Sequence, residues 1–309
     1  MAVDGIVLVD KPSGPTSHDV VARARKAYGT RRVGHAGTLD PMATGVLILG
    51  IGQATRLLGY LALDEKDYLA TVRLGITTVS DDAQGEVLQR SGATGLDGRD
   101  IARALDGQRG EIWQRPSDVS AIKVDGRRAH ALMRAGEQVV LEPRRVTISR
   151  IDLQGMDPGV DSAGTAYLDV AISVTCSSGT YIRAIARDLG QVLGTGGHLV
   201  ALRRTRVGGF RSDECVGLQD LPVDPMRPGV AAARSMPSHV VNADLVHRIR
   251  HGVQIPIPWV RSDTGTVAVL DGAGDLVAVA DDGGDLLRYR AVLVPATPEE
   301  GGRTPSGTL

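Results

Sequence analysis

The sequence predicts a mixed α/β protein with a large domain and a smaller β-rich one, and three observations lead to this fold class. The chain has 309 residues, which is more than a single compact core usually needs. In residues 1–225, short apolar runs alternate with segments of helical periodicity. After a cluster of prolines, residues 240–295 instead show strand patterns separated by Asp-Gly turns.

The first 51 residues contain two strand patterns with a helix and a loop between them. Gly5–Asp10 is a short apolar run without a preceding basic segment, which favours a strand over a signal peptide. Residues 16–28 predict a helix, capped by the threonine or the serine at its start. Residues 32–44 are rich in Gly, Thr and Asp and lack periodicity, so we expect a loop there. Val46–Ile51 is continuously apolar, as is typical of a buried strand.

The rest of the large domain continues this alternation. Residues 53–63 look helical, and residues 67–74 alternate between apolar and polar side chains as a strand does. A second helix is expected over 98–105, because its periodic pattern ends just before a glycine. Residues 166–175 again alternate as a strand, and residues 180–193 have the pattern of a helix.

Prolines mark the boundary between the two predicted domains. We expect a linker over 226–239, then a small β-rich domain over 240–295 with one short helix and turns at 271–272 and 282–283. The polar tail, 296–309, has the composition of a disordered segment. The boundary prolines are Pro222, Pro225, Pro228 and Pro237.

Composition excludes several classes of protein. No apolar run approaches the ~20 residues that a membrane helix needs. The two cysteines, Cys176 and Cys215, lie far apart without neighbouring Cys or His, so neither a disulfide framework nor a zinc site is expected. We therefore expect a cytoplasmic protein without metal or membrane partner. Aromatic residues make up 3% of the chain, which argues against a broad platform for stacking RNA bases.

The charge is unevenly distributed, although the net charge is only −1. The segment 115–150 holds eight basic and four acidic residues, and 181–211 holds six basic residues and one aspartate. Such patches can bind a polyanion whatever the total charge. They can equally be solvated arginine-rich faces, and composition alone does not decide between the two.

The most specific motif is the loop Gly34–Gly45, with the sequence GHAGTLDPMATG. A carboxylate on a glycine-rich loop beside a strand can sit deep in a cleft, where Asp40 would be available for catalysis. The alternative is that Asp40 only forms an Asx-turn before Pro41. Local chemistry by itself favours the second interpretation.

The motifs taken together resemble the bacterial tRNA pseudouridine-55 synthase family, also called the T-loop pseudouridine synthases. They occur in the same order over about 200 residues. This resemblance implies a pseudouridine synthase catalytic domain over 1–225 with a mixed, mainly antiparallel sheet, and a PUA-like RNA-binding domain over 240–295. The matching stretches are Gly5–Ser17, Gly34–Gly45, Gly52–Thr55, Lys66–Tyr68, Leu74–Gly75, Cys176–Arg183, Asp188–Gly190 and Gly197–Arg204.

The resemblance also implies an activity: isomerisation of the T-loop uridine of tRNA to pseudouridine by a base-flipping isomerase. The reaction exchanges no electrons, so no cofactor is implied. Asp40 matches the catalytic aspartate, and Lys11 and Pro12 match a motif that braces the active-site tyrosine. The residues implied in substrate binding are Tyr68, Arg183, Leu202, His35 and Tyr181.

An RNA-binding arm is implied over 112–150, where the basic residues gather. This arm departs from the family at Ser117, Val119 and His130, which weakens the match of its contacts and not that of the chemistry. We expect a monomer that binds the T stem-loop of tRNA, although residues 211–309 have a net charge of −4. The arm residues implied are Lys123, Arg127, Arg128, Arg144 and Arg145.

Other functions fit the sequence less well. The run Ile6–Asp10 resembles the start of a haloacid-dehalogenase-type phosphohydrolase, but Pro12 occupies the position where that mechanism needs a second acid. Neither glycine-rich stretch has the Gly-Lys-Ser/Thr signature of a phosphate-binding loop. An RNA-binding folding factor would use the same basic arm, and an Asp40→Asn variant distinguishes it from an isomerase. The pair Asp81-Asp82 fits a hairpin turn or a repulsive edge equally well.

Overall fold

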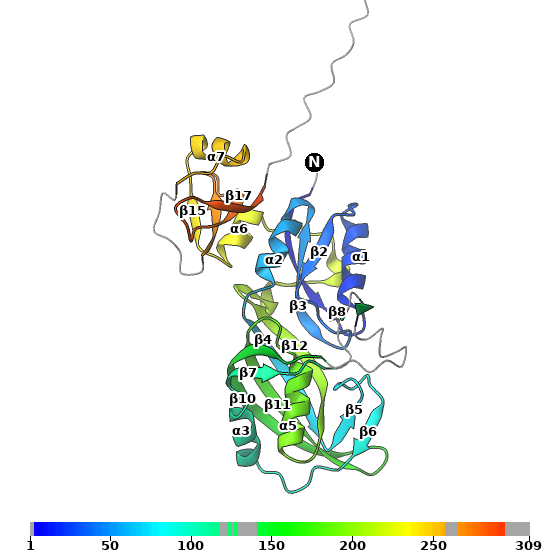
Figure 1. The fold of residues 1–309 in the computed structure, drawn as a ribbon. Helices are drawn as coiled ribbons and strands as arrows, with labels where there is room; N and C mark the ends of the chain where they lie inside the picture. Colours follow the sequence, from blue (N-terminus) through cyan, green and yellow to red (C-terminus); the bar gives the residue numbers. More distant parts are fainter. Residues whose placement is uncertain (1–2, 118–122, 125–126, 129–140, 257–264, 294–309) are drawn as a thin grey trace, which may run out of the picture.

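The structure is a computed structural model that describes residues 3–117, 123–124, 127–128, 141–256 and 265–293. Its main feature is a ten-stranded sheet that runs through the length of the large domain (Figure 1). The predicted tail, 296–309, and two of the family departures, Val119 and His130, lie outside the described residues.

The sheet is mixed and mainly antiparallel, which confirms the predicted fold class. Eight strands form the path, and β2 (Val33–Ala36) and β13 (Phe210–Arg211) pair beside it, with β3 and β12. The pairings β1–β14 and β3–β12 are parallel, and the other pairings of the sheet are antiparallel. In spatial order, the path is β14 (Val216–Gly217), β1 (Gly5–Lys11), β3 (Thr44–Ile51), β12 (Gly197–Val207), β4 (Lys66–Leu74), β11 (Ala166–Cys176), β10 (Arg144–Val160) and β7 (Gly110–Gln114).

Helix α1 (Ser17–Ala27) begins with the cap that the sequence predicts. The Thr16 hydroxyl accepts a hydrogen bond from the Asp19 amide, and the Asp19 carboxylate accepts one from the Thr16 amide. This reciprocal pair satisfies backbone donors that the helix cannot satisfy itself. A 3₁₀ helix at Gly52–Leu57 leads into the short α2 (Leu58–Leu61), as expected for 53–63.

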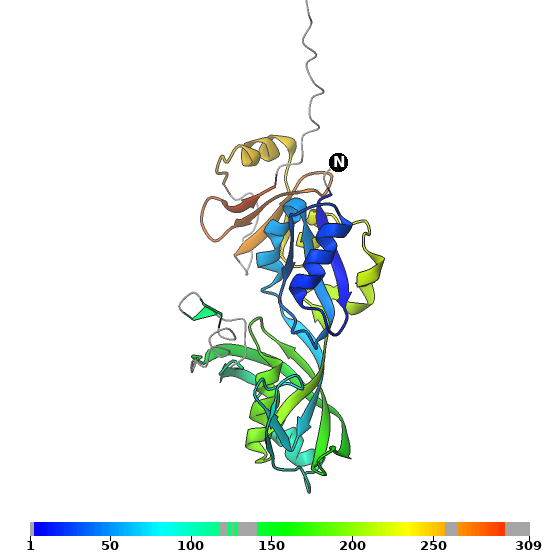
Figure 2. The ribbon, with the colours of Figure 1, turned by 90° about the vertical axis from the view of Figure 1, so that its right-hand side faces the viewer.

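Two helices cover one face of the lower half of the sheet in Figure 1. Helix α5 (Ile182–Val192) packs on β12 and β4, and α3 (Gly98–Asp106) packs on β10 and α5. On β4, the side chains from Lys66 to Leu74 alternate between buried and less buried, with Tyr68 on the covered face and Leu69 on the other. Strands β4 and β12 run from this half into the half formed by β1, β2, β3 and α1 (Figures 1 and 2).

Two expectations for the large domain are wrong. Residues 33–36 are not loop but strand β2, which pairs antiparallel with β3; a glycine and a histidine in four residues hide its pattern. No element was expected over 197–207, yet this segment forms the long strand β12. Its three arginines among the last five residues obscure the alternation.

The two ends of the expected arm, 112–150, belong to the main sheet. Strand β7 and the start of β10 pair with each other in the main sheet, so Arg144 and Arg145 are sheet residues. The side chains of Val146 and Ile148 on β10 are buried. The basic residues around them hide this alternation of buried and exposed side chains in the sequence. Between these strands, the described residues form a small pair, β8 (Lys123–Val124) and β9 (Arg127–Arg128).

The C-terminal sheet has four strands, and its core continues into the large domain. The expected linker, 226–239, contains a helix and the start of a strand. The apolar cluster that includes Ile6 and Leu8 of β1 also includes Ala268 and Leu276 of the C-terminal sheet. The turns at 271–272 and 282–283 lie between strands as predicted. The elements are α6 (Pro228–Ala233), β15 (Ser238–Val240), α7 (Ala243–Arg250), β16 (Thr266–Leu270), β17 (Leu276–Asp281) and β18 (Arg288–Val292).

Candidate active site

A pocket of about 290 Å³ lies where the Asp40 loop, β4, β12 and the start of α5 meet. It brings together segments that are far apart in the sequence, including five of the residues that the family resemblance implies. Its lining consists of Gly37, Thr38, Leu39, Asp40, Lys66, Tyr68, Ser177, Ser178, Gly179, Thr180, Tyr181, Ile182, Arg183, Leu202 and Arg204.

Asp40 and Arg183 form a two-point ion pair across this pocket. Arg183 Nε lies 3.0 Å from Asp40 Oδ2, and Arg183 Nη2 donates to Asp40 Oδ1 at 3.2 Å. The side chain of Arg183 is 6% exposed and that of Asp40 is 33% exposed. The guanidinium therefore orients the carboxylate from the protein side and leaves part of it open to the pocket.

Arg183 is itself held by the segment after β5 (Ile76–Thr78). Its Nη1 donates to Ser80 O at 2.9 Å and lies 3.5 Å from the buried carboxylate of Asp82. Asp82 also accepts hydrogen bonds from Ser80 Oγ and Gln84 N. These contacts decide between the two interpretations of the Asp81-Asp82 pair. The pair lies in the connection between β5 and β6 (Val87–Arg90), where Asp82 supports Arg183. The edge-repulsion alternative does not describe a buried, ion-paired carboxylate.

The backbone of the Asp40 loop is fixed by Lys11. This fully buried side chain donates from Nζ to Pro12 O, Pro41 O and Ala43 O at 2.9, 3.0 and 2.7 Å. Burial lowers the pKa of Lys11 to about 8, an effect that the nearby Asp40 carboxylate opposes. Lys11 and Pro12 were expected to brace the tyrosine. The hydrogen bonds of Lys11 connect β1 to the loop that carries Asp40.

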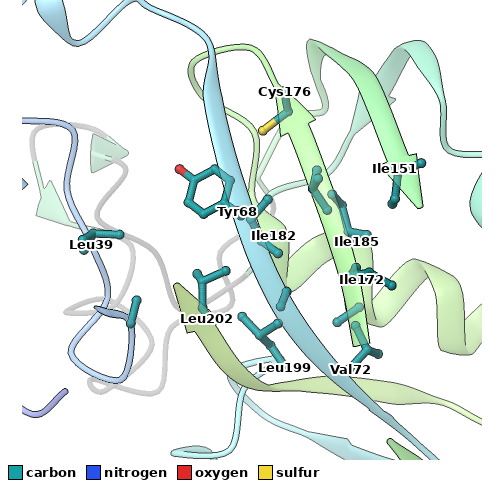
Figure 3. Close-up of a cluster of buried hydrophobic side chains, with 14 of the residues drawn as sticks. Leu39, Tyr68, Val72, Ile151, Ile172, Cys176, Ile182, Ile185, Leu199 and Leu202 are labelled. Carbon is teal, nitrogen blue, oxygen red and sulfur yellow. The ribbon is translucent and has the colours of Figure 1, made fainter. Parts of the chain in front are cut away.

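Tyr68 and Leu202 form the apolar side of the pocket. Both are 8% exposed, and Figure 3 shows them with Leu39 around the space beside β4. Burial raises the pKa of the Tyr68 hydroxyl, which keeps the ring neutral at physiological pH. An aromatic ring and an aliphatic side chain beside an oriented carboxylate suit a flat, uncharged ring such as a nucleobase.

Comparison with known proteins agrees with this geometry. Residues 25–182 match the N-terminal domain of the TruB family pseudouridylate synthases, and residues 183–224 match the tRNA pseudouridylate synthase B C-terminal domain. The chain belongs to the TruB family. Pseudouridine synthases are isomerases, and the fold and enzyme class expected from the sequence are confirmed.

The similarity extends over nearly the whole chain. A tRNA pseudouridine synthase B from Rhodococcus jostii is 48% identical over 297 residues, 95% of both chains. One from Thermobifida fusca is 50% identical over 283 residues, 90% of this chain and 94% of the relative. Among solved structures, a Cbf5-Nop10-Gar1 complex matches with a TM-score of 0.70 and 26% identity, covering 94% of this chain and 85% of that one.

Two of the residues that the family resemblance implies, Tyr181 and His35, lie in different places relative to the pocket. Tyr181 lines the pocket as the residue before α5, and its backbone is fixed by Gln114, which bonds to both Tyr181 N and Tyr181 O. His35 is not among the lining residues. It lies on β2, with its ring 5.5 Å from that of His18, and burial lowers its pKa to about 4.

Two lining cations were not predicted as site residues. Arg204 on β12 is opposite Tyr68 on β4, and Lys66 is two residues before Tyr68 on the same face of that strand. Both belong to stretches that carry the family resemblance, Lys66–Tyr68 and Gly197–Arg204. The burial of Arg204 could not be inferred, because the strand that carries it was itself missed.

Two other features are absent from the described residues. No three His, Cys, Asp or Glu side chains lie together in an arrangement that could hold a metal ion within the described ranges. In the same part of the chain, no helix is both long and apolar enough to cross a membrane.

Proposed function

We propose that the protein isomerises the T-loop uridine of tRNA to pseudouridine, with Asp40 as its catalytic carboxylate. The observation that carries the proposal is the Asp40–Arg183 pair beside Tyr68 and Leu202 in one pocket. Asp40 is the only carboxylate side chain among the described residues that line it. The relatives that match most of the chain are named tRNA pseudouridine synthase B, which supports tRNA as the substrate.

In this reaction the bond between uracil N1 and ribose C1′ breaks, the ring turns, and C5 bonds to C1′ while C5 loses its proton. A carboxylate promotes such a step as a nucleophile or as a base. Arg183 aligns Asp40 for this step through its two-point ion pair.

The target base must leave the RNA stack to enter the pocket. Extrusion of a nucleotide costs a few kcal/mol. Stacking on Tyr68 can return about 1–3 kcal/mol of this. Leu202 lies beside Tyr68 in the pocket and adds an apolar contact for the ring (Figure 3).

RNA binding outside the pocket is assigned to the basic arm and to the C-terminal domain, whose sequence resembles the PUA fold. The described strands β8 and β9 carry Lys123, Arg127 and Arg128. Contacts between these cations and phosphates make the affinity fall as salt rises, because bound counterions are released. We further infer a monomer that acts in the cytoplasm, where tRNA is modified.

The test is tritium release from a T-loop RNA labelled at uridine C5, which measures loss of the C5 proton. Wild type should release one tritium per RNA, and Asp40→Asn should release none while binding the RNA with similar affinity. Asp157→Asn, which removes an exposed carboxylate outside the pocket, is the matched control and should behave as wild type. Tight binding without release by wild type would instead favour an RNA-binding folding factor.

A further inference from the structure

Two buried cations, Lys66 and Arg204, line the pocket beside Tyr68. Lys66 is 5% exposed and Arg204 is 1% exposed. Lys66 Nζ donates to Ala62 O at 2.9 Å and Asp64 O at 2.6 Å. Arg204 donates from Nε to Val46 O at 2.8 Å and from Nη2 to Gly37 O at 2.9 Å. All four acceptors are uncharged backbone carbonyls.

The charges that line the pocket do not balance. Arg183 pairs with Asp40 and also with the buried Asp82, whereas the other two lining cations, Lys66 and Arg204, form no such ion pair. Within the described part of the chain, no carboxylate oxygen lies within 4 Å of either cation. Burial and the neighbouring Arg204 lower the pKa of Lys66 to about 8, so Lys66 remains mostly charged at neutral pH.

The Asp64 carboxylate acts on Lys66 only from beyond ion-pair distance. Burying two cations without a carboxylate in contact is costly, and such arrangements are typical of sites that receive negative charge. Gly37 lets the cations approach the Asp40 loop. A Cβ on Gly37 would lie 3.2 Å from Arg204 Nη1 and 3.6 Å from Lys66 Cε, and its backbone has a φ of +74°, which favours glycine. The loop therefore packs directly against both cations.

We propose that Lys66 and Arg204 stabilise the negative charge that develops on the uracil ring when its bond to ribose breaks. The inference rests on the proposed isomerisation. As the N1–C1′ bond breaks, its electron pair leaves with the ring, and the charge spreads over N1 and the two ring oxygens. When C5 bonds to C1′, the C5 proton is lost and N1 takes up a proton, so the overall reaction remains an isomerisation.

The position of the two cations favours the ring over an RNA phosphate as the group that they stabilise. Arg204 is the cross-strand partner of Tyr68, so the cation lies next to the side chain that contacts the base. Both cations are almost fully buried, whereas a third of the Asp40 side chain is exposed. A phosphate stays attached to the RNA chain and to the more exposed side of the pocket. Preorganised donors at a developing charge give large rate effects in a site that excludes water.

The experiment compares Lys66→Met and Lys66→Arg with wild type in single-turnover conversion of a T-loop RNA at saturating enzyme. Lys66→Met should react about 10²–10³-fold more slowly, with RNA affinity close to that of wild type. Lys66→Arg should recover much of the rate, because it keeps the charge. The matched control is Lys26→Met, which removes an exposed lysine of α1 and should leave the rate unchanged.

A second substrate separates stabilisation of the ring from a merely structural role. An RNA with 5-fluorouridine at the target position has a ring that carries negative charge more readily. The rate defect of Lys66→Met, followed as loss of 5-fluorouridine from the digested RNA, should shrink at least tenfold on this substrate. The rates on the two substrates are measured on the same preparation of enzyme. Any unfolded fraction lowers both rates equally and therefore cancels in their ratio.

Three results would overturn the inference. They are a Lys66→Met rate within twofold of wild type, an equal defect on both substrates, or a defect confined to RNA affinity and its salt dependence, which would indicate a phosphate contact. If wild type itself formed no pseudouridine, the proposed function would fail instead, and the two failures are thereby distinguishable.

Discussion

The two walls of the pocket hold their cations in different ways. On the α5 wall, Arg183 is neutralised by carboxylates, with Asp40 on one side and Asp82 on the other. On the opposite side, Lys11 behind the Asp40 loop and Arg204 in the pocket lining donate to backbone carbonyls at distances of 2.7 to 3.0 Å.

This difference assigns different tasks to the two walls. A two-point ion pair fixes the direction of the carboxylate that it includes. A cation held by carbonyls fixes the backbone while keeping most of its positive charge for the pocket. The α5 wall therefore sets the orientation of Asp40, and the opposite wall sets the shape of its loop and the potential of the pocket. Changes to the first should act on the reaction, and loss of Lys11 from the support of the second should act mainly on stability.

Among changes to the residues that hold Asp40 in place, the largest effect is expected from Arg183→Met, which removes both contacts to Asp40 and leaves Asp82 buried without its cation. Misplacement of a catalytic group by about 1 Å can cost about 10²-fold in rate. We therefore expect at least this loss in single-turnover pseudouridine formation, together with a lower melting temperature.

Arg187→Met is the matched control for this change. Arg187 lies one turn further along α5 and pairs with Asp81 and Asp188 outside the pocket lining. Its loss should reduce the rate far less. Equal losses for the two variants would show that α5 needs its arginines only for folding.

A smaller effect on the same wall is expected from Asp82→Asn. The amide keeps the shape of the side chain and an acceptor for Ser80 Oγ and Gln84 N, but it removes the charge that lies 3.5 Å from Arg183 Nη1. We expect a loss of about tenfold in rate, equivalent to about 1.4 kcal/mol. RNA affinity, measured by filter binding, should be unchanged. A rate equal to that of wild type would mean that Ser80 O alone positions Arg183.

Much of the α5 wall was predictable from the sequence. The strand β4 and the helix α5 have clear periodicity, and the motif around Tyr181 places Arg183 at the start of that helix. The role of Asp82 was not predictable, because a sequence does not show that a turn after β5 folds back onto α5. The ion pair exists only through this long-range contact.

The opposite wall was predicted less completely. Asp40, Lys11 and Pro12 were identified by resemblance, yet the contacts of Lys11 were assigned to the tyrosine and not to the Asp40 loop. Strand β12 was missed, and with it the burial of Arg204. A basic strand in a sequence resembles a solvated face, and only pairing with β4 shows that one of its arginines points inward.

A change to the opposite wall, Lys11→Met, should act mainly on stability. It leaves the carbonyls of Pro12, Pro41 and Ala43 without their donor, and each buried group left without a partner costs about 1–3 kcal/mol. We expect the free energy of unfolding, measured in urea, to fall by at least about 1–3 kcal/mol. The exposed Lys26→Met is the control.

The pH dependence of the same variant provides an independent test. The pKa of Lys11 is about 8 in the folded protein and 10.5 is the ordinary value, so the unfolded state binds more protons between these values. Wild type should therefore gain stability as pH rises from about 8 to 10. This gain should be smaller in Lys11→Met. If stability rose equally steeply with pH in the variant, Lys11 would bind protons equally well in the folded and unfolded states.

The smallest effect is expected at His35, which lies behind the opposite wall on β2. Burial, His18 and Arg204 lower its pKa from 6.5 to about 4, so the folded protein holds it neutral where the unfolded chain binds a proton. The free energy of unfolding should then decrease as pH falls from 6.5 to 4, by at most about 1.4 kcal/mol per pH unit. His35→Gln should flatten this slope in urea titrations at pH 7, 6 and 5, whereas His247→Gln, on the exposed side of α7, should follow wild type. If His35→Gln kept the wild-type slope, the buried His35 would not be the source of the loss of stability at acid pH.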